Sequence, residues 1–120
     1  MTKEEDDHRL AWFRDARFGM FVHWGIFTVP AGEWDGSTWH GVWIHQTANI
    51  PGEDYVKLAS EFNPVEFDAD ELVALAERTG MKYIVITAKN HDGFCMFRSE
   101  LTDYNIVDAT PYGRDPMMEL

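Results

Sequence analysis

The sequence predicts an α/β fold with a parallel β-sheet, and three observations carry this prediction. Two nearly continuous apolar runs, residues 18–25 and 82–88, have the composition of strands buried on both faces, as strands in parallel sheets are. Helical segments lie between the two runs, in the order of a right-handed βαβ unit. A whole (β/α)8 barrel takes about 250 residues, so we expect this chain of 120 residues to hold only the first two β/α units.

The segments around the first run are assigned from local patterns. Residues 1–8 are polar and mostly acidic, and we expect them to form a disordered tail before a partial domain that spans 9–120. A short helix is expected within 9–16. The segment 52–62 repeats apolar residues at intervals of three and four, which predicts one buried helical stripe. Its members are Tyr55, Leu58, Ala59 and Phe62.

The clearest helix signal precedes the second run. Asp68 is a good N-cap residue, and Glu71 follows three positions later, as in a capping box. Gly80 supplies a left-handed stop at the other end. A further helix is expected to begin near residues 114–116. The helix expected between Asp68 and Gly80 has one apolar face, formed by Leu72, Leu75, Ala76 and Thr79.

Composition and charge exclude several classes of partner. The formal net charge of −11 argues against nucleic acid and against anionic membrane surfaces, because both select clustered Lys and Arg. The acidic start is the reverse of a secretory signal, so we expect a cytoplasmic protein. The single cysteine, Cys95, excludes an internal disulfide and is expected to be a small buried side chain. His40 and His45 lack the spacing of a helical zinc pair, and we expect both at the surface.

Polar side chains follow both predicted strands. Active sites of parallel barrels lie where strands end, at the C-terminal face. His23 ends the first run, and Asn90, His91 and Asp92 follow the second. Two imidazoles at one rim indicate a ligand site, although His23 could also be a core imidazole bonded to a backbone carbonyl. We expect Asp92 to be mainly structural, capping amides of a tight turn with Gly93.

The tryptophans are concentrated in the first third of the chain, at a density that exceeds the needs of a core and suits stacking on flat apolar ligand faces. Trp34, Trp39 and Trp43 lie in an irregular segment, 26–52, and a segment this long without regular structure is usually functional. At least one of these rings is expected to form a wall of the pocket. Trp12 is expected to pack against the bottom or side of the barrel.

Several separated motifs resemble one known family. The run ARFGMFVHWG at 16–25 is similar to the N-terminal signature of family 29 glycoside hydrolases, the α-L-fucosidases. Further motifs at 41–44, 50–64, 80–94, 102–105 and 114–115 keep the family's order, so the resemblance covers essentially everything after residue 9. It implies a TIM barrel, of which this chain holds the N-terminal part.

The resemblance also implies a reaction and a set of substrate contacts. The family hydrolyses terminal α-L-fucosyl residues of glycoconjugates or oligosaccharides with retention, using an aspartate nucleophile and a second carboxyl group about 5–5.5 Å away. Neither matches a position in these 120 residues, so the isolated chain is expected to be inactive and poorly folded. The family's substrate-binding positions fall on His23, Trp43, Asn90 and His91, with Trp43 beside the apolar face of fucose. No metal or cofactor is implied.

Two positions depart from the family pattern and leave alternatives open. Asn90 stands where the family usually has histidine, and Val42 stands where relatives often have glutamate. A sugar hydroxyl that loses its buried partner costs about 1–3 kcal/mol, so a specificity-shifted or non-catalytic sugar-binding barrel is one alternative. The other is a metal-dependent hydrolase with His23, His91 and Asp92 as ligands, against which the absence of a His-x-His pair in the first strand speaks.

Overall fold

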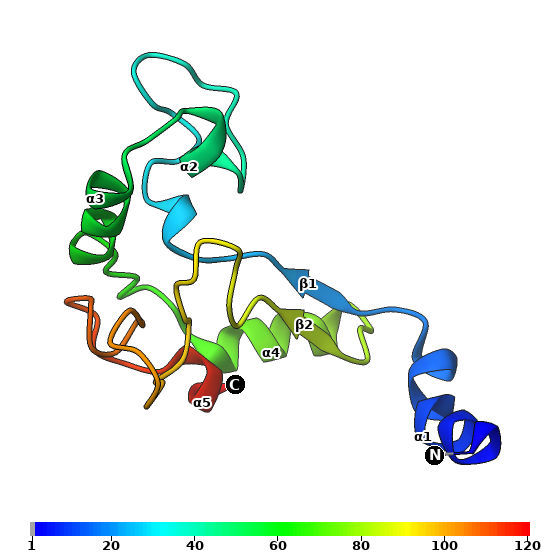
Figure 1. Cartoon of the computed structure of the whole chain (residues 1–120). Coiled ribbons are helices and arrows are strands. Elements are labelled where there is room, and N and C mark those ends of the chain that lie inside the picture. The colour runs from blue at the N-terminus through cyan, green and yellow to red at the C-terminus, as the bar shows by residue number, and fades with distance from the viewer. Residues whose placement is uncertain (1) are drawn as a thin grey trace.

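The computed structural model describes residues 2–120, without the side chains of residues 3–6. Two strands, β1 and β2, pair in parallel with Met20 opposite Ile84 and Val22 opposite Ile86, which confirms the predicted parallel pairing. Figure 1 shows the sheet between helix α1 on one side and a lobe of loops and short helices on the other. The elements in chain order are α1 Lys3–Ala16, β1 Met20–Val22, η1 Ile26–Thr28, α2 Ile44–Thr47, α3 Gly52–Tyr55, η2 Val56–Ser60, α4 Ala69–Arg78, β2 Ile84–Ile86 and α5 Pro116–Glu119.

Helix α4 begins and ends at the residues that its caps predict. The Asp68 carboxylate accepts a hydrogen bond from the Glu71 N–H at 2.9 Å. At the other end Gly80 adopts a φ of 79°, and the Met81 N–H donates to the Ala76 carbonyl at 2.9 Å. A left-handed glycine and a backbone bond back into the last turn are the expected end of a helix. The chain is thereby turned directly into β2.

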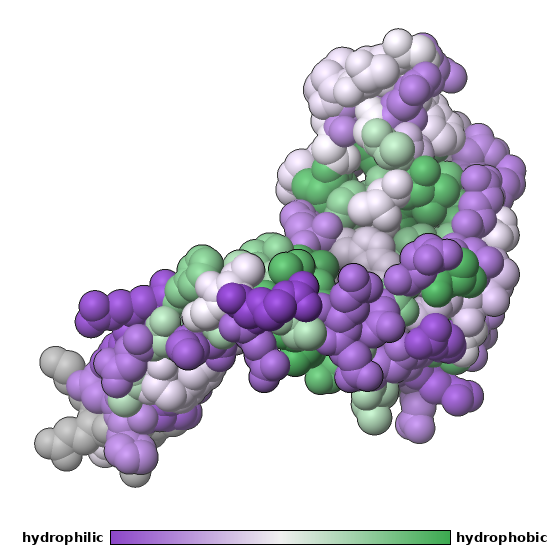
Figure 2. All heavy atoms as spheres, turned by 180° about the vertical axis from the view of Figure 1, so that it is seen from behind, coloured by the Kyte–Doolittle hydropathy of each residue, from purple (hydrophilic) through white to green (hydrophobic). Residues whose placement is uncertain are grey.

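The strands are shorter than the apolar runs and are not buried on both faces, which corrects the sequence-based expectation. Phe21, in the middle of β1, is 67% exposed, and Val85, opposite it in β2, is 40% exposed. Among the described residues each strand has only the other as a sheet neighbour, so alternate side chains face outward without a covering layer. Figure 2 shows apolar atoms at the surface near the middle of the molecule.

Helix α1 begins at Lys3, so the helical region reaches into the segment that the sequence predicts as a disordered tail. Met1 lies outside the described residues. Lysine, glutamate and leucine are good helix formers, and this propensity outweighs the acidic composition of the segment. The rings of Trp12 and Phe13 contact Tyr83, with centroids 6.3 and 5.0 Å apart. Tyr83 immediately precedes β2, so Trp12 packs at the N-terminal edge of the sheet, as predicted.

Most of the core lies beyond the C-terminal ends of the strands, in the lobe of loops. The predicted stripe of the 52–62 segment is buried, although two short helices, α3 and η2, replace the single helix expected. Cys95 is buried beside this core, as predicted. The core cluster consists of Ile26, Ile44, Ile50, Tyr55, Leu58, Ala59, Phe62, Phe94, Met96, Ile106 and Tyr112.

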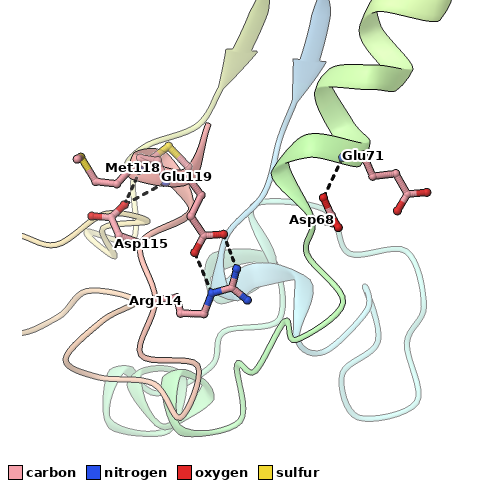
Figure 3. A network of polar contacts seen from close by, with 7 residues as sticks. Asp68, Glu71, Arg114, Asp115, Met118 and Glu119 are labelled. Carbon is pink, nitrogen blue, oxygen red and sulfur yellow. Dashed lines mark hydrogen bonds and ion pairs between the residues drawn. The ribbon is translucent and has the colours of Figure 1, made fainter.

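The last helix, α5, also starts where the sequence predicts. The Asp115 carboxylate accepts hydrogen bonds from the N–H groups of Met117 and Met118, at 3.0 and 3.1 Å. Arg114 donates two hydrogen bonds to the Glu119 carboxylate, at 2.8 and 2.5 Å (Figure 3). This helix is therefore held at its first turn by one carboxylate cap and one two-pronged ion pair. In the described part of the chain, no helix has both the length and the apolar character needed to cross a membrane.

Candidate functional site

The loops that follow β1 and β2 begin at the same edge of the sheet. The Thr87 N–H donates to the Val22 carbonyl at 3.1 Å, which continues the parallel ladder past the strands. The Thr87 hydroxyl then accepts a hydrogen bond from the Trp24 N–H at 3.0 Å. His23 lies between these two contacts. The structure therefore places His23 at the C-terminal edge from which the 90–94 loop also departs, as the sequence predicts.

The 90–94 loop is a tight turn closed by its own side chains. The Gly93 N–H donates to the Asn90 carbonyl at 3.1 Å, and Gly93 has a φ of 84°, which favours glycine. The Asp92 carboxylate accepts a hydrogen bond from the Phe94 N–H at 3.0 Å. This geometry confirms the structural role predicted for Asp92 and fixes the direction in which the loop leaves the sheet.

Trp43 covers the tip of this loop. Its ring stacks on the imidazole of His91 with centroids 3.9 Å apart and an interplanar angle of 20°. Trp43 remains half-exposed, and it directly precedes helix α2. The irregular segment 26–52 thus folds back over the rim, and Trp43 is the tryptophan that reaches a predicted site residue.

Asn90 and His91 are also paired with each other. The Asn90 Oδ1 lies 3.1 Å from the His91 Nδ1. Because an amide oxygen only accepts hydrogen bonds, this contact places the proton of a neutral His91 on Nδ1 and leaves Nε2 as an acceptor. The Asn90 Nδ2 is buried and has no hydrogen-bond partner among the described residues. The Asn90 amide therefore carries one buried donor that no described protein group satisfies.

The His23 side chain is exposed. Its ring contacts are with Phe27 and Phe21, at centroid distances of 5.2 and 6.1 Å. Within the described residues His23 is therefore not a buried core imidazole. The structure puts this ring on the open edge of the sheet, with an aromatic neighbour on the loop that follows β1.

The sequence model of the alpha-L-fucosidase family matches residues 1–120. The chain belongs to the α-L-fucosidase family. It is 38% identical to the tissue alpha-L-fucosidase of Mus musculus and 36% identical to that of Homo sapiens, over 92% of this chain and 26% and 25% of those relatives. The chain thus spans about a quarter of the length of the curated relatives it matches.

Solved fucosidase structures agree with this assignment. Alpha-L-fucosidase AlfC from Lactobacillus casei, in complex with its α-L-fucose product, matches with a TM-score of 0.87 and 45% identity, over 92% of this chain and 35% of that chain. A family 29 fucosidase from Bacteroides thetaiotaomicron, trapped as a covalent intermediate, matches with a TM-score of 0.88 and 40% identity, over 95% of this chain and 26% of that chain. The resemblance predicted from the motifs is confirmed.

Two histidines of the chain lie elsewhere than predicted. His40 is 9% exposed rather than at the surface, and its Nδ1 is 2.7 Å from the Thr47 hydroxyl. His45 is partly buried, because its ring stacks on Tyr55 with centroids 4.2 Å apart. The segment has no apolar period from which burial could be predicted, and the burial of both histidines results from its folding back through α2.

The other tryptophans of the segment do not contact His91 in this way. Trp34 is partly buried against the core, together with Trp24. Trp39 is 71% exposed and contacts His40, with ring centroids 4.5 Å apart. The sequence could not distinguish these roles, because all of these rings share the same irregular stretch and the same composition of neighbours.

Sequence reasoning missed one polar contact of the site, the hydrogen bond between Tyr55 and Asp92. The Tyr55 hydroxyl donates to the second carboxylate oxygen of Asp92 at 2.8 Å. Burial, this hydrogen bond and the negative charge of Asp92 all raise the pKa of Tyr55 far above its usual range, so the hydroxyl stays protonated. The apolar stripe predicted the burial of Tyr55 but not its partner, which lies 37 positions away.

The residues considered as metal ligands do not form a metal site. Within residues 2–120, as far as their side chains are described, no three His, Cys, Asp or Glu side chains converge in a way that could hold a metal ion. Asp92 uses both carboxylate oxygens for protein donors, Tyr55 and the Phe94 N–H. His91 is covered on one face by Trp43. What the arrangement offers is an aromatic wall with amide and imidazole hydrogen-bonding groups, which suits a polar ligand with an apolar face.

Proposed function

We propose that this chain is the N-terminal part of the (β/α)8 barrel of an α-L-fucosidase, and that it supplies part of the fucose pocket. The observation that carries the proposal is the stack of Trp43 on His91 at the C-terminal edge of the parallel strand pair. Barrel enzymes place their ligands at this edge. The AlfC structures from the same family include complexes with α-L-fucose and with Fuca(1,6)GlcNAc.

Each pocket residue has a role that follows from its contacts. Trp43 gives one face to His91 and keeps surface exposed, which fits it to the apolar face and methyl group of fucose. The Asn90 Nδ2 donates to a sugar oxygen, which removes the cost of about 1–3 kcal/mol for an unpaired buried donor. The His91 Nε2 accepts from a sugar hydroxyl. His23, exposed at the same edge, supplies a further hydrogen bond.

The reaction we propose is retaining hydrolysis of terminal α-L-fucosyl residues from glycoconjugates or oligosaccharides. One carboxylate attacks the anomeric carbon while a second protonates the departing oxygen, and the latter then deprotonates the water that releases fucose. The covalent intermediate trapped in the Bacteroides thetaiotaomicron relative supports this route. We assign both carboxyl groups to the remainder of the barrel. Asp92 is unsuited to either role because both its oxygens are bonded inside the protein.

A specificity-shifted or non-catalytic sugar-binding barrel is the second candidate. It is favoured by Asn90, which donates and accepts hydrogen bonds but cannot become cationic as an imidazole can. Val42 adds no polar group to the loop next to Trp43. These two residues distinguish this chain from the pattern that the family usually shows, and they bear on how tightly fucose is held rather than on where it binds.

The experiment that tests the proposal is hydrolysis of 4-nitrophenyl α-L-fucopyranoside by the complete protein that carries this chain. Trp43→Ala removes the wall and is expected to raise KM about fivefold or more, because stacking on a sugar face contributes about 1 kcal/mol or more. Trp39→Ala is the matched control, since Trp39 contacts His40 instead of His91. Fucose binding without hydrolysis would support the second candidate. Neither hydrolysis nor binding of fucose would contradict both.

A further inference from the structure

We infer that the hydroxyl of Tyr55 is a positioning group of the pocket, which acts through Asp92 to hold His91 against Trp43. The inference rests on the proposed function for what His91 does, and on the contacts of the structure for how His91 is held. It assigns Tyr55 no contact with substrate, because Tyr55 is only 1% exposed. Its effect on fucose must therefore pass through the residues it touches.

Two hydrogen bonds hold the Asp92 carboxylate in its orientation. One carboxylate oxygen accepts the Phe94 N–H at 3.0 Å, and the other accepts the Tyr55 hydroxyl at 2.8 Å. Hydrogen bonds to a charged acceptor are stronger than those between neutral groups. The Phe94 bond is local and closes the turn, whereas the Tyr55 bond ties the turn to helix α3. The Tyr55 bond thus adds a side-chain tie between Asp92 and helix α3, beside the packing of Phe94 on Phe62 and Tyr104.

Helix α2 and the residue before it contact both His91 and Tyr55. Trp43 precedes Ile44, which is fully buried and anchors the helix in the core. On one side of Ile44, Trp43 stacks on His91. On the other side, His45 stacks on the Tyr55 ring with an interplanar angle of 17°. One short helix thus lies over the imidazole and over the tyrosine that holds the imidazole's loop.

These contacts form a closed ring of interactions. It runs from the Tyr55 hydroxyl to Asp92, along the backbone to His91, across the stack to Trp43, through α2 to His45, and back to the Tyr55 ring. A closed ring of this kind restrains each member more than separate pairs would, because no member moves without displacing two neighbours. The Tyr55 hydroxyl is the one link that a single substitution removes without changing the ring packing.

Tyr55→Phe in the complete protein is the direct test. A displacement of about 1 Å in a group that orients substrate costs up to about a hundredfold in rate, and we expect kcat/KM for 4-nitrophenyl α-L-fucopyranoside to fall roughly tenfold. The loss should appear mainly in KM, since His91 holds substrate and transition state alike. The dissociation constant for L-fucose should rise by a similar factor.

Tyr104→Phe is the matched control. Tyr104 packs on Phe94, and the negative charge of Asp92 contributes to raising its pKa, so it belongs to the same neighbourhood. Its hydroxyl is buried without a partner among the described residues. Removing it deletes a buried tyrosine hydroxyl but no bond to Asp92. We expect KM and the fucose dissociation constant to stay within about twofold of the unmodified protein, as for a change that touches no substrate contact.

A second pair of variants covers a Tyr55→Phe protein that does not fold. Asp92→Asn keeps an oxygen for the Phe94 N–H and an amide that donates to the Tyr55 hydroxyl, so it should retain most of the affinity for fucose. Asp92→Ala removes both bonds and should lose more than Tyr55→Phe does. Combined with Tyr55→Phe, Asp92→Ala should show no further loss, because both changes break the same link.

The outcomes separate this inference from the proposed function. Equal KM and fucose affinity in Tyr55→Phe and Tyr104→Phe would overturn the positioning role while the fucosidase assignment stands. An unmodified protein that neither cleaves the fucoside nor binds fucose would contradict the proposed function. Amide hydrogen exchange of Gly93 and Phe94 measures how firmly the loop is held. It should be faster in Tyr55→Phe than in the unmodified protein, and unchanged in Tyr104→Phe. Equal exchange in the two variants would overturn the inference.

Discussion

The lobe of loops and the two-stranded sheet differ in how far they bury their apolar side chains. In the lobe, residues from 26–62 and 94–112 enclose each other, so Ile26, Ile44 and Ile106 are fully buried although they lie only in short helices or a turn. In the sheet layer, Phe21 and Val85 lie in regular strands and remain exposed. The comparison shows that contacts within this chain are enough to bury the apolar side chains of the lobe. The two-stranded sheet leaves one face uncovered within the described residues.

The largest effect expected from this difference is at Phe94. Its ring is buried in the lobe, against Phe62 and Tyr104. Phe94→Ala should lower the free energy of unfolding by about 3–5 kcal/mol, the cost of emptying a buried phenylalanine site. Leu101→Ala is the control, because Leu101 is 97% exposed and should change stability by less than about 0.5 kcal/mol. Urea denaturation measures both, and equal effects would contradict a packed lobe.

Phe21 tests the other half of the comparison, the exposed face of the sheet. Within these 120 residues its side chain has no covering layer, so the contacts of this chain alone predict almost no loss of stability for Phe21→Ala. In the complete protein, where we propose that other barrel elements cover this face, the same change should cost about 3 kcal/mol. A small effect on the unfolding free energy of the complete protein would show that the face stays open, and would count against the barrel.

The alkaline limit of stability sharpens the description of the lobe. Burial raises the pKa of Tyr55 and of Tyr104 above the ordinary value of 10.0. The unfolded chain therefore loses these protons at a lower pH than the folded chain. The contribution of these two protonated phenols to the free energy of unfolding is complete below pH 10. It decreases above pH 10, by up to about 1.4 kcal/mol per pH unit for each group. Tyr55→Phe should flatten the fall of the urea midpoint above pH 10, and an unchanged slope would contradict a buried, hydrogen-bonded phenol.

The smallest expected effect concerns the cap of α4. Asp68→Ala removes the acceptor of the Glu71 N–H and should lower stability by about 1 kcal/mol. Asp70→Ala changes an exposed carboxylate of the same first turn that caps nothing in the described structure, and should cost less. Thermal unfolding of the two variants gives the difference. Equal losses would mean that charge near the helix start matters and that the cap does not.

Sequence reasoning succeeded where the cause of a structure is local. The Asp68 cap, the Gly80 stop and the Asp92–Gly93 turn each depend on residues within a few positions, so their spacing predicts them. The parallel strands were predicted because helices and apolar runs alternate. Trp43 was selected by the family resemblance, and its stack on His91 is a long-range contact that agrees with the pocket position implied.

The remaining features depend on contacts that no local pattern encodes. The burial of His40 and the Tyr55–Asp92 bond both arise when an irregular segment folds back. Such a segment has no repeating apolar pattern from which these contacts could be predicted. Phe21 is exposed because no described element covers its face of the sheet. An apolar run shows that a strand is suited to burial, but it does not show whether a covering element is present. The start of α1 at Lys3 shows helix propensity outweighing the acidic composition that predicts a tail.

A structure of the complete protein with bound L-fucose tests the account most directly. We expect the sugar at the C-terminal edge of β1 and β2, with its apolar face on Trp43 and its hydroxyl groups within hydrogen-bonding distance of His23, Asn90 and His91. The Asn90 Nδ2, which has no partner in the described chain, should then donate to a fucose oxygen. Fucose bound away from the Trp43–His91 stack, or a tryptophan swung off the imidazole to admit it, would contradict the pocket proposed for this chain.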